Sequence, residues 1–398
     1  MKVALLSQYF KPEMGAPQNR LYEMMKELQN LGQDVYVITG MPNYPTGSIY
    51  EHYKKKFSCN DSVDGIPVKR YWLYTSTSRK ALPRFLNMVS FSLTALCATW
   101  KLRKGRPDYI IVETPPLTLT VTAWILSKLT GAKLVTNVSD LWPLSAVELG
   151  AFSKDSLPYK VLAAIESFAY RHSSFCMGQS EEIVEYIKEH GARDTYLFRN
   201  GVDPTRFNGI ERTIPKKGLR IVYAGLLGFA QGISDIIRNI NFEELGAEFH
   251  VYGSGGEKEL IENYLAKNPN NGIYYHGSVE STEIPNVLVN ADVTLIPLVK
   301  NIFGAVPSKI YESMAAGKPI IFSGEGEGQR IVQTNNIGWT TPVKDYEKIK
   351  EIIRCLVSNP TMIEEKSKFC QQCAEMKFNR PKQVAALNNF LEQKRIIQ

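Results

Sequence analysis

The chain alternates between short apolar runs and stretches with helical periodicity. Residues 3–9 form a mostly apolar run typical of a buried strand. Leu21, Met24 and Leu28 then recur at the spacing of one helix face, and residues 34–39 form the next apolar run. Because this order repeats along the chain, the pattern predicts βαβ units and parallel sheets.

The same alternation predicts two α/β domains. Residues 201–218 (GVDPTRFNGIERTIPKKG) are rich in glycine, proline and charge without periodicity, so they are interpreted as a linker. Residues 1–200 and 219–380 are then the two domains, and residues 381–398 form a helix, with packing back on the N-terminal domain as one option. The further strands expected are 67–73, 108–113, 132–138, 174–179 and 195–198, then 219–224, 247–252, 272–276, 292–297 and 319–323.

Composition and cysteine usage narrow the class of protein. At 398 residues with 44% hydrophobic and 22% charged side chains, a two-domain globular protein is expected. No secretory signal is evident and the six cysteines are scattered, which favours the cytoplasm. Cys370 and Cys373 form a C-x-x-C, but no second Cys or His pair follows, so free thiols are favoured over zinc.

The positive charge is concentrated in one window. Residues 51–106 hold twelve basic and three acidic side chains, whereas the whole chain carries +7. Inside this window, residues 85–100 are uncharged and are shorter than the roughly twenty residues of a membrane-spanning helix. Two interpretations stay open: a core helix with solvated flanks, or an apolar and cationic surface that rests on anionic lipid headgroups. Nucleic-acid binding is disfavoured because no base-recognition motif accompanies the charge.

A loop before a helix in the second domain carries candidate chemistry. Pro307 and Ser308 are good helix-start residues, so backbone N–H groups of residues 303–309 beside Lys309 suit a phosphate or diphosphate. Glu312, one turn on, can accept hydrogen bonds from vicinal hydroxyls such as those of a ribose. An ordinary N-capped surface helix is the alternative.

The segment PSKIYESMAAGKPII, residues 307–321, resembles the retaining glycosyltransferases of family 4, and further motifs match in order along the chain. The resemblance implies the GT-B fold, with two Rossmann-like domains whose parallel sheets face each other across a cleft. It also implies a nucleotide-sugar donor, UDP-linked by that analogy. A reaction without metal or other cofactor is expected because the five histidines have no metal-ligand spacing and no Asp-x-Asp motif is present. The further motifs are Gly15, Asp140–Pro143, Ser180, Asn200–Asp203 with Phe207, Gly225 with Gly228 and Gly232, Tyr252–Glu257 and His276-Gly277.

The resemblance also assigns roles to side chains. Asp140 lies where the family has a His or Asp facing the reacting sugar, so it joins Lys309 and Glu312 as a catalytic candidate. A turn-capping Asp is the alternative. Glu113 and Trp142 are assigned to the acceptor side. The donor-binding candidates are Gly15, Arg20, Gly225, Gly228, Gly253, Gly255, His276, Ala305, Val306, Pro307 and Ser308.

Three positions depart from the family pattern. Gly304 stands where members usually carry a Glu that contacts the transferred sugar, and Leu226 and Gln231 replace a common Arg and Lys. We therefore expect Lys309 to carry more of the diphosphate, with Arg20 as a helper. Because this Glu is absent, the site is compatible with a donor whose transferred sugar is a deoxy or amino sugar.

The motifs YFKPEMGAPQNR and SDLWP narrow the branch to enzymes of bacterial O-antigen and capsule synthesis, similar to N-acetyl-fucosaminyl transferases of the WbuB type. The expected function is transfer of a sugar, such as L-FucNAc, from a UDP-sugar to a polyprenyl-diphosphate-linked saccharide. The expected location is the cytoplasm, with peripheral contact to the inner membrane face through residues 51–106. A GT-B epimerase or phosphorylase and a non-catalytic glycosyltransferase-like subunit are the alternatives.

Overall fold

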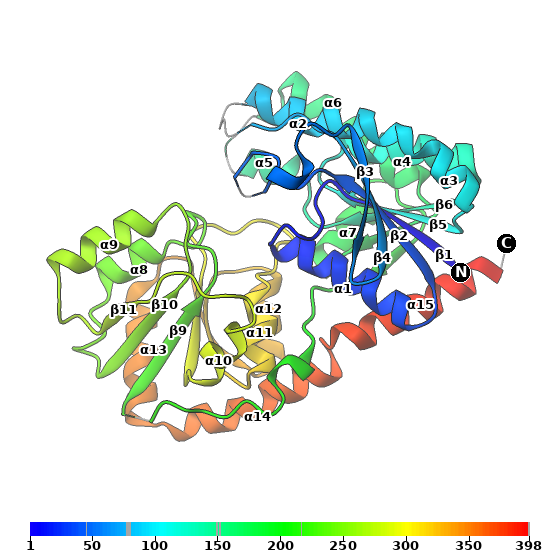
Figure 1. Cartoon of the computed structure of the whole chain (residues 1–398). Coiled ribbons are helices and arrows are strands. Elements are labelled where there is room, and N and C mark those ends of the chain that lie inside the picture. The colour runs from blue at the N-terminus through cyan, green and yellow to red at the C-terminus, as the bar shows by residue number, and fades with distance from the viewer. Residues whose placement is uncertain (45, 77–80, 149, 151–152, 216, 397–398) are drawn as a thin grey trace. The chain divides into compact units, whose positions relative to one another are not determined.

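The computed structural model describes residues 1–44, 46–76, 81–148, 150, 153–215 and 217–396 (Figure 1). The chain divides into two compact units, each built around its own sheet. Residues Met1–Arg199 and Pro381–Gln398 form the first unit, and Asn200–Arg380 form the second. Both are Rossmann-like α/β units, as the alternating pattern predicts.

The first unit contains an eight-stranded sheet in the order β3-β4-β2-β1-β5-β6-β7-β8. Every pairing is parallel except that of β3 with β4. The strands are β1 (Lys2–Leu6), β2 (Asp34–Gly40), β3 (Ser58–Val63), β4 (Ile66–Tyr71), β5 (Tyr109–Thr114), β6 (Lys133–Val138), β7 (Phe175–Gly178) and β8 (Thr195–Leu197).

Strand β3 was not expected from the apolar pattern. Its sequence SCNDSV is polar and only partly buried, because it lies at the edge of the sheet. It pairs antiparallel with β4 through a turn at Asp64 and Gly65, whose φ angles are 50° and 82°. Asp-Gly is a strong hairpin signal, so this turn is the feature that predicts the strand.

Helices cover both faces of the first sheet. Buried side chains of α1 (Ala16–Asn30) and α15 (Arg380–Ile396) pack on one face, and those of α2 (Ala81–Thr94), α3 (Thr99–Gly105) and α4 (Thr118–Thr130) pack on the other. Val384, Leu387 and Leu391 of α15 are fully buried in the core of this first unit. The remaining helices are α5 (Leu144–Glu148), α6 (Leu157–His172) and α7 (Glu181–Glu189), with short 3₁₀ turns at η1 (Glu51–Tyr53) and η2 (Ala95–Ala98).

The apolar stretch of the basic window is longer than the sequence indicated. Among the described residues, Phe85–Gly105 is a 21-residue helical stretch with mean hydropathy 1.2, which by length and composition alone is sufficient to cross a membrane. One stripe of this stretch belongs to the core, because Phe91, Ala95, Ala98 and Leu102 are fully buried. Arg79 and Lys80 of the same window lie outside the described residues.

The second unit contains a six-stranded, fully parallel sheet in the order β11-β10-β9-β12-β13-β14. Strand β14 was not expected, since its sequence GWTT is short and only partly buried at the sheet edge. The strands are β9 (Leu219–Ala224), β10 (Ala247–Tyr252), β11 (Ile273–Tyr275), β12 (Val293–Pro297), β13 (Ile320–Ser323) and β14 (Gly338–Thr341).

Two layers of helices enclose this sheet. One face carries α8 (Ile233–Asn239), α9 (Lys258–Lys267) and α13 (Tyr346–Ser358). The other carries α10 (Ile284–Val289), α11 (Lys309–Ala315), α12 (Glu327–Thr334), α14 (Thr361–Met376) and the 3₁₀ turn η3 (Pro204–Phe207).

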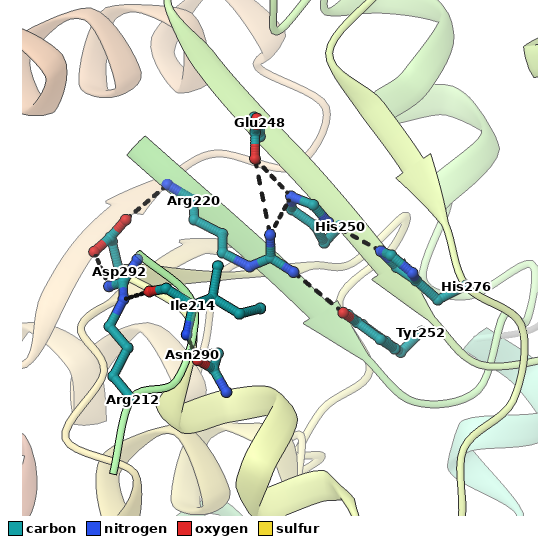
Figure 2. Close-up of polar contacts among 9 residues, drawn as sticks. All are labelled: Arg212, Ile214, Arg220, Glu248, His250, Tyr252, His276, Asn290 and Asp292. Carbon is teal, nitrogen blue, oxygen red and sulfur yellow. Dashed lines mark hydrogen bonds and ion pairs between the residues drawn. The ribbon is translucent and has the colours of Figure 1, made fainter. Parts of the chain in front are cut away.

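The segment expected to be a free linker is instead packed on the second unit. Val202 forms a parallel bridge with Asn379, and the Arg212 guanidinium lies 2.5 Å from a carboxylate oxygen of Asp292. The backbone of the segment is also tied down, because the amide of Ile214 donates to the side chain of Asn290 (Figure 2). The boundary between the units therefore falls at residues 199 and 200, and the segment belongs to the second unit.

The strand order identifies where each unit is expected to bind a ligand. In open parallel sheets, ligands bind beyond the carboxyl ends of the strands, at the point where the direction of the crossovers reverses. That point lies between β1 and β5 in the first unit and between β9 and β12 in the second. The loops after β1 and β9 contain Gly15 and Gly225, Glu113 lies near the carboxyl end of β5, and Lys309 begins the helix that follows β12.

Candidate active site

Lys309 occupies the reversal point of the second sheet. It begins α11 after the loop that leaves β12, and its Nζ lies 5.2 Å from the ring centroid of Tyr223 on β9. Gly225 makes this position possible, because a Cβ there would lie 2.2 Å from Cε of Lys309. Gly225 also has a φ of +146°, which L side chains rarely adopt. The glycine therefore creates the space that the lysine fills.

The surroundings of Lys309 favour an anion. Burial lowers the pKa of its ammonium, and nearby Glu312 raises it. A partly desolvated cation of this kind gains interaction energy when a phosphate approaches, since the local dielectric is lower than in water. The position thus suits a phosphate or diphosphate, as the sequence predicts.

Glu312 is held by an arginine that the sequence analysis did not identify. A guanidinium nitrogen of Arg206, on η3, lies 3.6 Å from the Glu312 carboxylate, and both side chains are about one third exposed. Arg206 also donates to the carbonyl oxygen of Ser281 at 3.3 Å. The only sequence signal for Arg206 is its place beside Phe207 in the 201–218 segment, which is interpreted from the sequence as a linker.

Backbone amides at the start of α11 are expected from the sequence to be available to a ligand, but several of them already donate to nearby carbonyl oxygens. The amides of Ile310 and Tyr311 donate to the carbonyls of Pro307 and Ser308 at 3.1 Å, and the amide of Ala305 donates to Ile302 at 3.1 Å. The helix has only seven residues, and Ser308 makes no side-chain cap. The side chain of Lys309 is therefore the stronger candidate for an anion contact, and Val306 packs on the core.

The other predicted donor-binding glycines hold loops together. A Cβ on Gly253 would lie 1.8 Å from the carbonyl oxygen of Gly225, and one on Gly255 would lie 2.4 Å from that of Leu227. A Cβ on Gly228 would meet the Gln231 side chain at 2.7 Å. Backbone therefore packs directly on backbone between the loops after β9 and β10, and a side chain at Gly253 or Gly255 would separate them.

Glu257 fills the start of helix α8, which the sequence analysis did not anticipate. Its buried carboxylate accepts from the amide of Ile233 at 2.8 Å and from the Ser234 hydroxyl at 2.5 Å. A carboxylate at this position satisfies the first amides of the helix. The Glu257 carboxylate, which follows the glycine-rich loop after β10, thus occupies the anion position at the start of α8.

His276 directly follows β11 and is an exposed residue. The ring stacks on Tyr252, with centroids 4.3 Å apart, and its Nε2 lies 2.9 Å from Nδ1 of His250 (Figure 2). Burial lowers the pKa of His276, and Arg220 lowers it further. The residue is neither a free side chain nor a packed core histidine, because hydrogen bonding and stacking both fix it at the strand end.

In the first unit, Arg20 and Glu113 are bound to each other. Their side chains are 2% and 6% exposed, and the guanidinium lies 2.6 Å from the carboxylate. Asn137 donates to the other carboxylate oxygen at 2.5 Å, and the Ser139 hydroxyl also donates to Glu113. The pair braces α1 against β5 and β6, and the expected roles of Arg20 and Glu113 in donor and acceptor binding stay predictions.

Asp140, in contrast, keeps the features of a functional carboxylate. It follows β6 and accepts a hydrogen bond from the Ser145 hydroxyl at 3.1 Å. Burial raises its pKa, and Glu148 raises it further. The adjacent Trp142 is partly buried, and its amide donates to the Asp140 carbonyl at 3.0 Å. A raised pKa brings the carboxylate closer to the range of a general base at neutral pH.

Gly15 is closed by a neighbouring side chain. It precedes α1, and a Cβ there would lie 2.4 Å from the amide oxygen of Gln18. The buried Gln18 therefore occupies the space that was expected to admit a ligand. The six cysteines are unpaired, and the described residues contain no group of three or more His, Cys, Asp or Glu side chains arranged to hold a metal ion.

Comparisons with known proteins agree with this two-unit architecture. Residues 15–201 match the sequence model of the glycosyl transferase 4-like domain, and residues 207–376 match that of the glycosyl transferases group 1. The chain is 29% identical over 265 residues to the probable glycosyltransferase WbjE of Pseudomonas aeruginosa, a match covering 63% of this chain and 66% of that protein.

Two further proteins are similar over a larger share of the chain. The putative colanic acid biosynthesis glycosyl transferase WcaI of Escherichia coli is 23% identical, over 82% of this chain and 84% of its own. The structure of Anabaena Alr3699/HepE in complex with UDP superposes with a TM-score of 0.72 at 16% identity, covering 99% of this chain and 100% of that one. With both domain models matched in succession and the two Rossmann-like sheets observed, the chain belongs to the GT4-type, group 1 glycosyltransferases of the GT-B fold.

Proposed function

We propose that the protein transfers a sugar from a UDP-sugar to a lipid-linked saccharide during synthesis of a bacterial surface polysaccharide, with retention at the anomeric carbon and without a metal ion. The observation that carries this proposal is the partly desolvated Lys309 ammonium beside Gly225, at the reversal point of the second sheet. The similarity to WcaI and to a structure solved with UDP supports the choice of reaction and donor.

The leaving group sets the main physical demand of this reaction. As the bond from the sugar to the diphosphate breaks, negative charge accumulates on the diphosphate and must be stabilised. Lys309 supplies a cation whose position is fixed by Tyr223 and Gly225. Glu312 lies one turn along α11, where its carboxylate can accept hydrogen bonds from the ribose hydroxyls of the nucleotide.

Gly304 supports a proposal for the class of the transferred sugar. This residue has a φ of +79°, so the loop takes a left-handed turn there that a Glu would adopt only with strain. The site thus lacks the carboxylate by which related enzymes contact hydroxyls of the transferred sugar. A sugar poorer in hydroxyls, such as the deoxy-amino sugar L-FucNAc, fits this arrangement.

Asp140 is the proposed acceptor-side residue. Because burial raises its pKa, the carboxylate is a better proton acceptor than an exposed Asp. The Ser145 hydroxyl fixes its orientation from α5. We assign Asp140 to orienting the acceptor hydroxyl and helping to remove its proton.

A membrane contact accounts for the exposed side of α2 and α3. Leu82, Phe85, Leu93 and Trp100 are 66%, 51%, 62% and 76% exposed, although Phe91 on the same helix is buried in the core. Exposed Arg103 and Lys104 follow in α3. A helix with one face in the core and an apolar, cation-flanked face outside suits the interface of an anionic membrane. We place the protein at the inner face of the plasma membrane on this ground.

The reaction is tested by mass spectrometry of the protein incubated, without added metal, with UDP-, GDP- and dTDP-sugars and a short polyprenyl-diphosphate saccharide. A product heavier by one sugar is expected, and proton NMR of its anomeric signal is expected to show retention. A donor that changes without any acceptor would instead indicate an epimerase, and phosphate-dependent turnover a phosphorylase. Donors that all stay unaltered would favour a non-catalytic subunit.

The membrane contact has a separate test. Binding to vesicles of phosphatidylglycerol is expected to weaken at least tenfold in the Phe85→Ser/Trp100→Ser double variant. The matched control is Phe369→Ser on α14, which is 43% exposed but lies in the second unit. Equal vesicle binding by the wild type and the double variant would contradict the membrane contact and leave the transfer reaction unaffected.

A further inference from the structure

A hydrogen-bonded chain of three side chains crosses one face of the second sheet. A terminal nitrogen of Arg220, on β9, lies 2.8 Å from Nε2 of His250 on β10, and Nδ1 of His250 lies 2.9 Å from Nε2 of His276 (Figure 2). The second terminal nitrogen of Arg220 donates to the Tyr252 hydroxyl at 3.3 Å. These contacts link the interior of the sheet to the exposed residue His276.

The chemistry of arginine gives this chain a direction. A guanidinium only donates hydrogen bonds, so Nε2 of a neutral His250 must accept from Arg220. The single proton of that ring is then on Nδ1, which donates to Nε2 of His276. Nε2 of a neutral His276 therefore carries no proton, and its own proton is on Nδ1. Arg220 thus determines the tautomer of a histidine that it does not touch.

Glu248 competes with Arg220 for the same nitrogen. One of its carboxylate oxygens lies 3.0 Å from Nε2 of His250, where it would favour a proton on that nitrogen. Glu248 is 48% exposed and can turn its carboxylate to water, whereas Arg220 is only 12% exposed and is held by His250 and Tyr252 as well as by a 3.8 Å ion pair with Glu248 itself. The more buried donor therefore decides the direction of the chain.

A doubly protonated His250 would satisfy Glu248 and His276 together, but its surroundings oppose that state. Burial is the largest cause that lowers the pKa of His250 to about 4, and the positive charge of Arg220 lowers it further. Glu248 opposes this shift, and His276 adds to it. His250 is therefore neutral at pH 7, and the direction imposed by Arg220 holds under physiological conditions.

Ring stacking fixes the end of the chain in space. The rings of His276 and Tyr252 are 9° from parallel, and His250 stacks on Tyr274 at 4.8 Å. The two nitrogens of an imidazole diverge within the ring plane, so Nδ1 of His276 points away from His250. An exposed histidine with a fixed plane and a fixed tautomer is a preorganised hydrogen-bond donor.

The position of this donor connects it with the nucleotide. His276 lies at the carboxyl end of β11, and the loop that follows it reaches Ser281. Arg206 joins the Ser281 carbonyl to the Glu312 carboxylate, the proposed ribose contact. The base of a nucleotide is joined directly to its ribose, so a nucleotide whose ribose contacts Glu312 can turn its base toward this loop.

We propose that Arg220, acting through His250, makes Nδ1–H of His276 a donor to the group at C4 of a pyrimidine base, which selects uracil, with a carbonyl oxygen there, over cytosine, with an amino group there. This inference rests on the proposed nucleotide-sugar function. His276 is the specificity-determining residue, and Arg220 and His250 are positioning residues. The amino group of cytosine would face a donor with another donor, which leaves both without partners.

The tautomer is measured directly, without any ligand. Nitrogen NMR of protein labelled at its five histidines, with His276 assigned from a His276→Gln sample, distinguishes a proton on Nδ1 from one on Nε2. His276 is expected to carry the proton on Nδ1 in the wild type. In Arg220→Met, Glu248 becomes the only charged partner of His250, so the proton is expected to move to Nε2 of both rings. Glu248→Gln is the matched control and is expected to keep the wild-type tautomer.

A second measurement tests which nucleotide base the protein prefers. Calorimetry with UDP and CDP is expected to show wild-type preference for UDP of about five- to hundredfold, the value of one satisfied against one unsatisfied hydrogen bond. Glu248→Gln is expected to keep this preference, and Arg220→Met to lose or invert it. His250→Phe retains a stacking ring but interrupts the chain, so it is expected to lose the preference even if Arg220→Met does not fold.

The outcomes separate the two proposals. A proton on Nε2 of His276 in the wild type overturns the directional chain, whatever the nucleotide data show. Equal wild-type affinity for UDP and CDP overturns the assignment of the base alone. Binding of neither nucleotide overturns the proposed function and the base assignment with it, while the tautomer measurement still decides whether Arg220 directs the chain.

Discussion

Replacing Lys309 by methionine tests the center of the proposed site. Methionine keeps an unbranched apolar side chain beside Gly225 and over the Tyr223 ring but removes the charge. A hydrogen bond between a charged donor and a phosphate contributes about 1.5–3 kcal/mol. Lys309→Met is therefore expected to weaken UDP binding by about tenfold to 150-fold. Transfer is expected to lose about 10²–10³ in rate if the same contact strengthens as the diphosphate leaves.

The stability of the Lys309→Met variant distinguishes a binding role of Lys309 from a structural role. Because burial lowers the pKa of Lys309, its charged form disfavours the folded state at pH 7. This destabilisation is full below the folded pKa and disappears as pH rises toward the ordinary lysine value. Lys309→Met is therefore expected to unfold at the same urea concentration as the wild type or a higher one. A lower midpoint would indicate that the lysine holds the fold together.

Calorimetric titration with UDP across pH is the assay, with Gln231→Ala as the matched control in the neighbouring loop. Wild-type affinity is expected to fall as pH rises through the lowered pKa of Lys309, because the ammonium is lost. Lys309→Met is expected to lack this dependence. Comparable UDP affinity and transfer rate in Lys309→Met and Gln231→Ala would refute the assignment of the diphosphate to Lys309.

Three further perturbations have distinct expected outcomes. Arg20→Leu leaves the buried Glu113 carboxylate without its cation, so urea denaturation is expected to show a loss of about 3–5 kcal/mol, and an unchanged midpoint would contradict the brace. Glu13 is buried in the loop between β1 and α1, and burial raises its pKa to about 7, so its carboxyl group keeps a proton to a higher pH in the folded state than in the unfolded one. The stability of the wild type relative to Glu13→Gln is then expected to fall between pH 5 and 8, whereas a constant difference would show that Glu13 titrates normally. Gly225→Ala places a methyl group 2.2 Å from Cε of Lys309, and its UDP affinity, measured by calorimetry, is expected to fall as in Lys309→Met. Affinity equal to that of the wild type would mean that the ammonium does not contact the nucleotide.

The sheets were predictable where strands are buried on both faces. Strands such as β9 and β12 consist mainly of buried apolar residues, and the sequence boundaries of β9 agree with the structure to the residue. Strands β3 and β14 were missed because edge strands are half exposed and need no apolar run. The Asp64-Gly65 turn shows that hairpin chemistry carries information that hydrophobic periodicity lacks.

The candidate site was predictable in its residue types but not in its partners. The sequence identified Lys309 and Glu312, since a cation and a carboxylate one turn apart at a helix start indicate anion and hydroxyl binding. It could not show that Arg20 pairs with Glu113, 93 positions away, rather than with a ligand. It also could not show the Arg220 chain, which exists only because β9, β10 and β11 lie side by side.

The return of α15 to the first unit has a consequence for biosynthesis. Val384, Leu387 and Leu391 complete a core whose other members lie between Val3 and Phe198. A ribosome must therefore make about 180 residues of the second unit before the first unit can close its core. At roughly 5–20 residues per second, this delay is on the order of 10–35 seconds. During that interval the apolar surface that α15 later covers is exposed, so the nascent chain is expected to bind ribosome-associated chaperones.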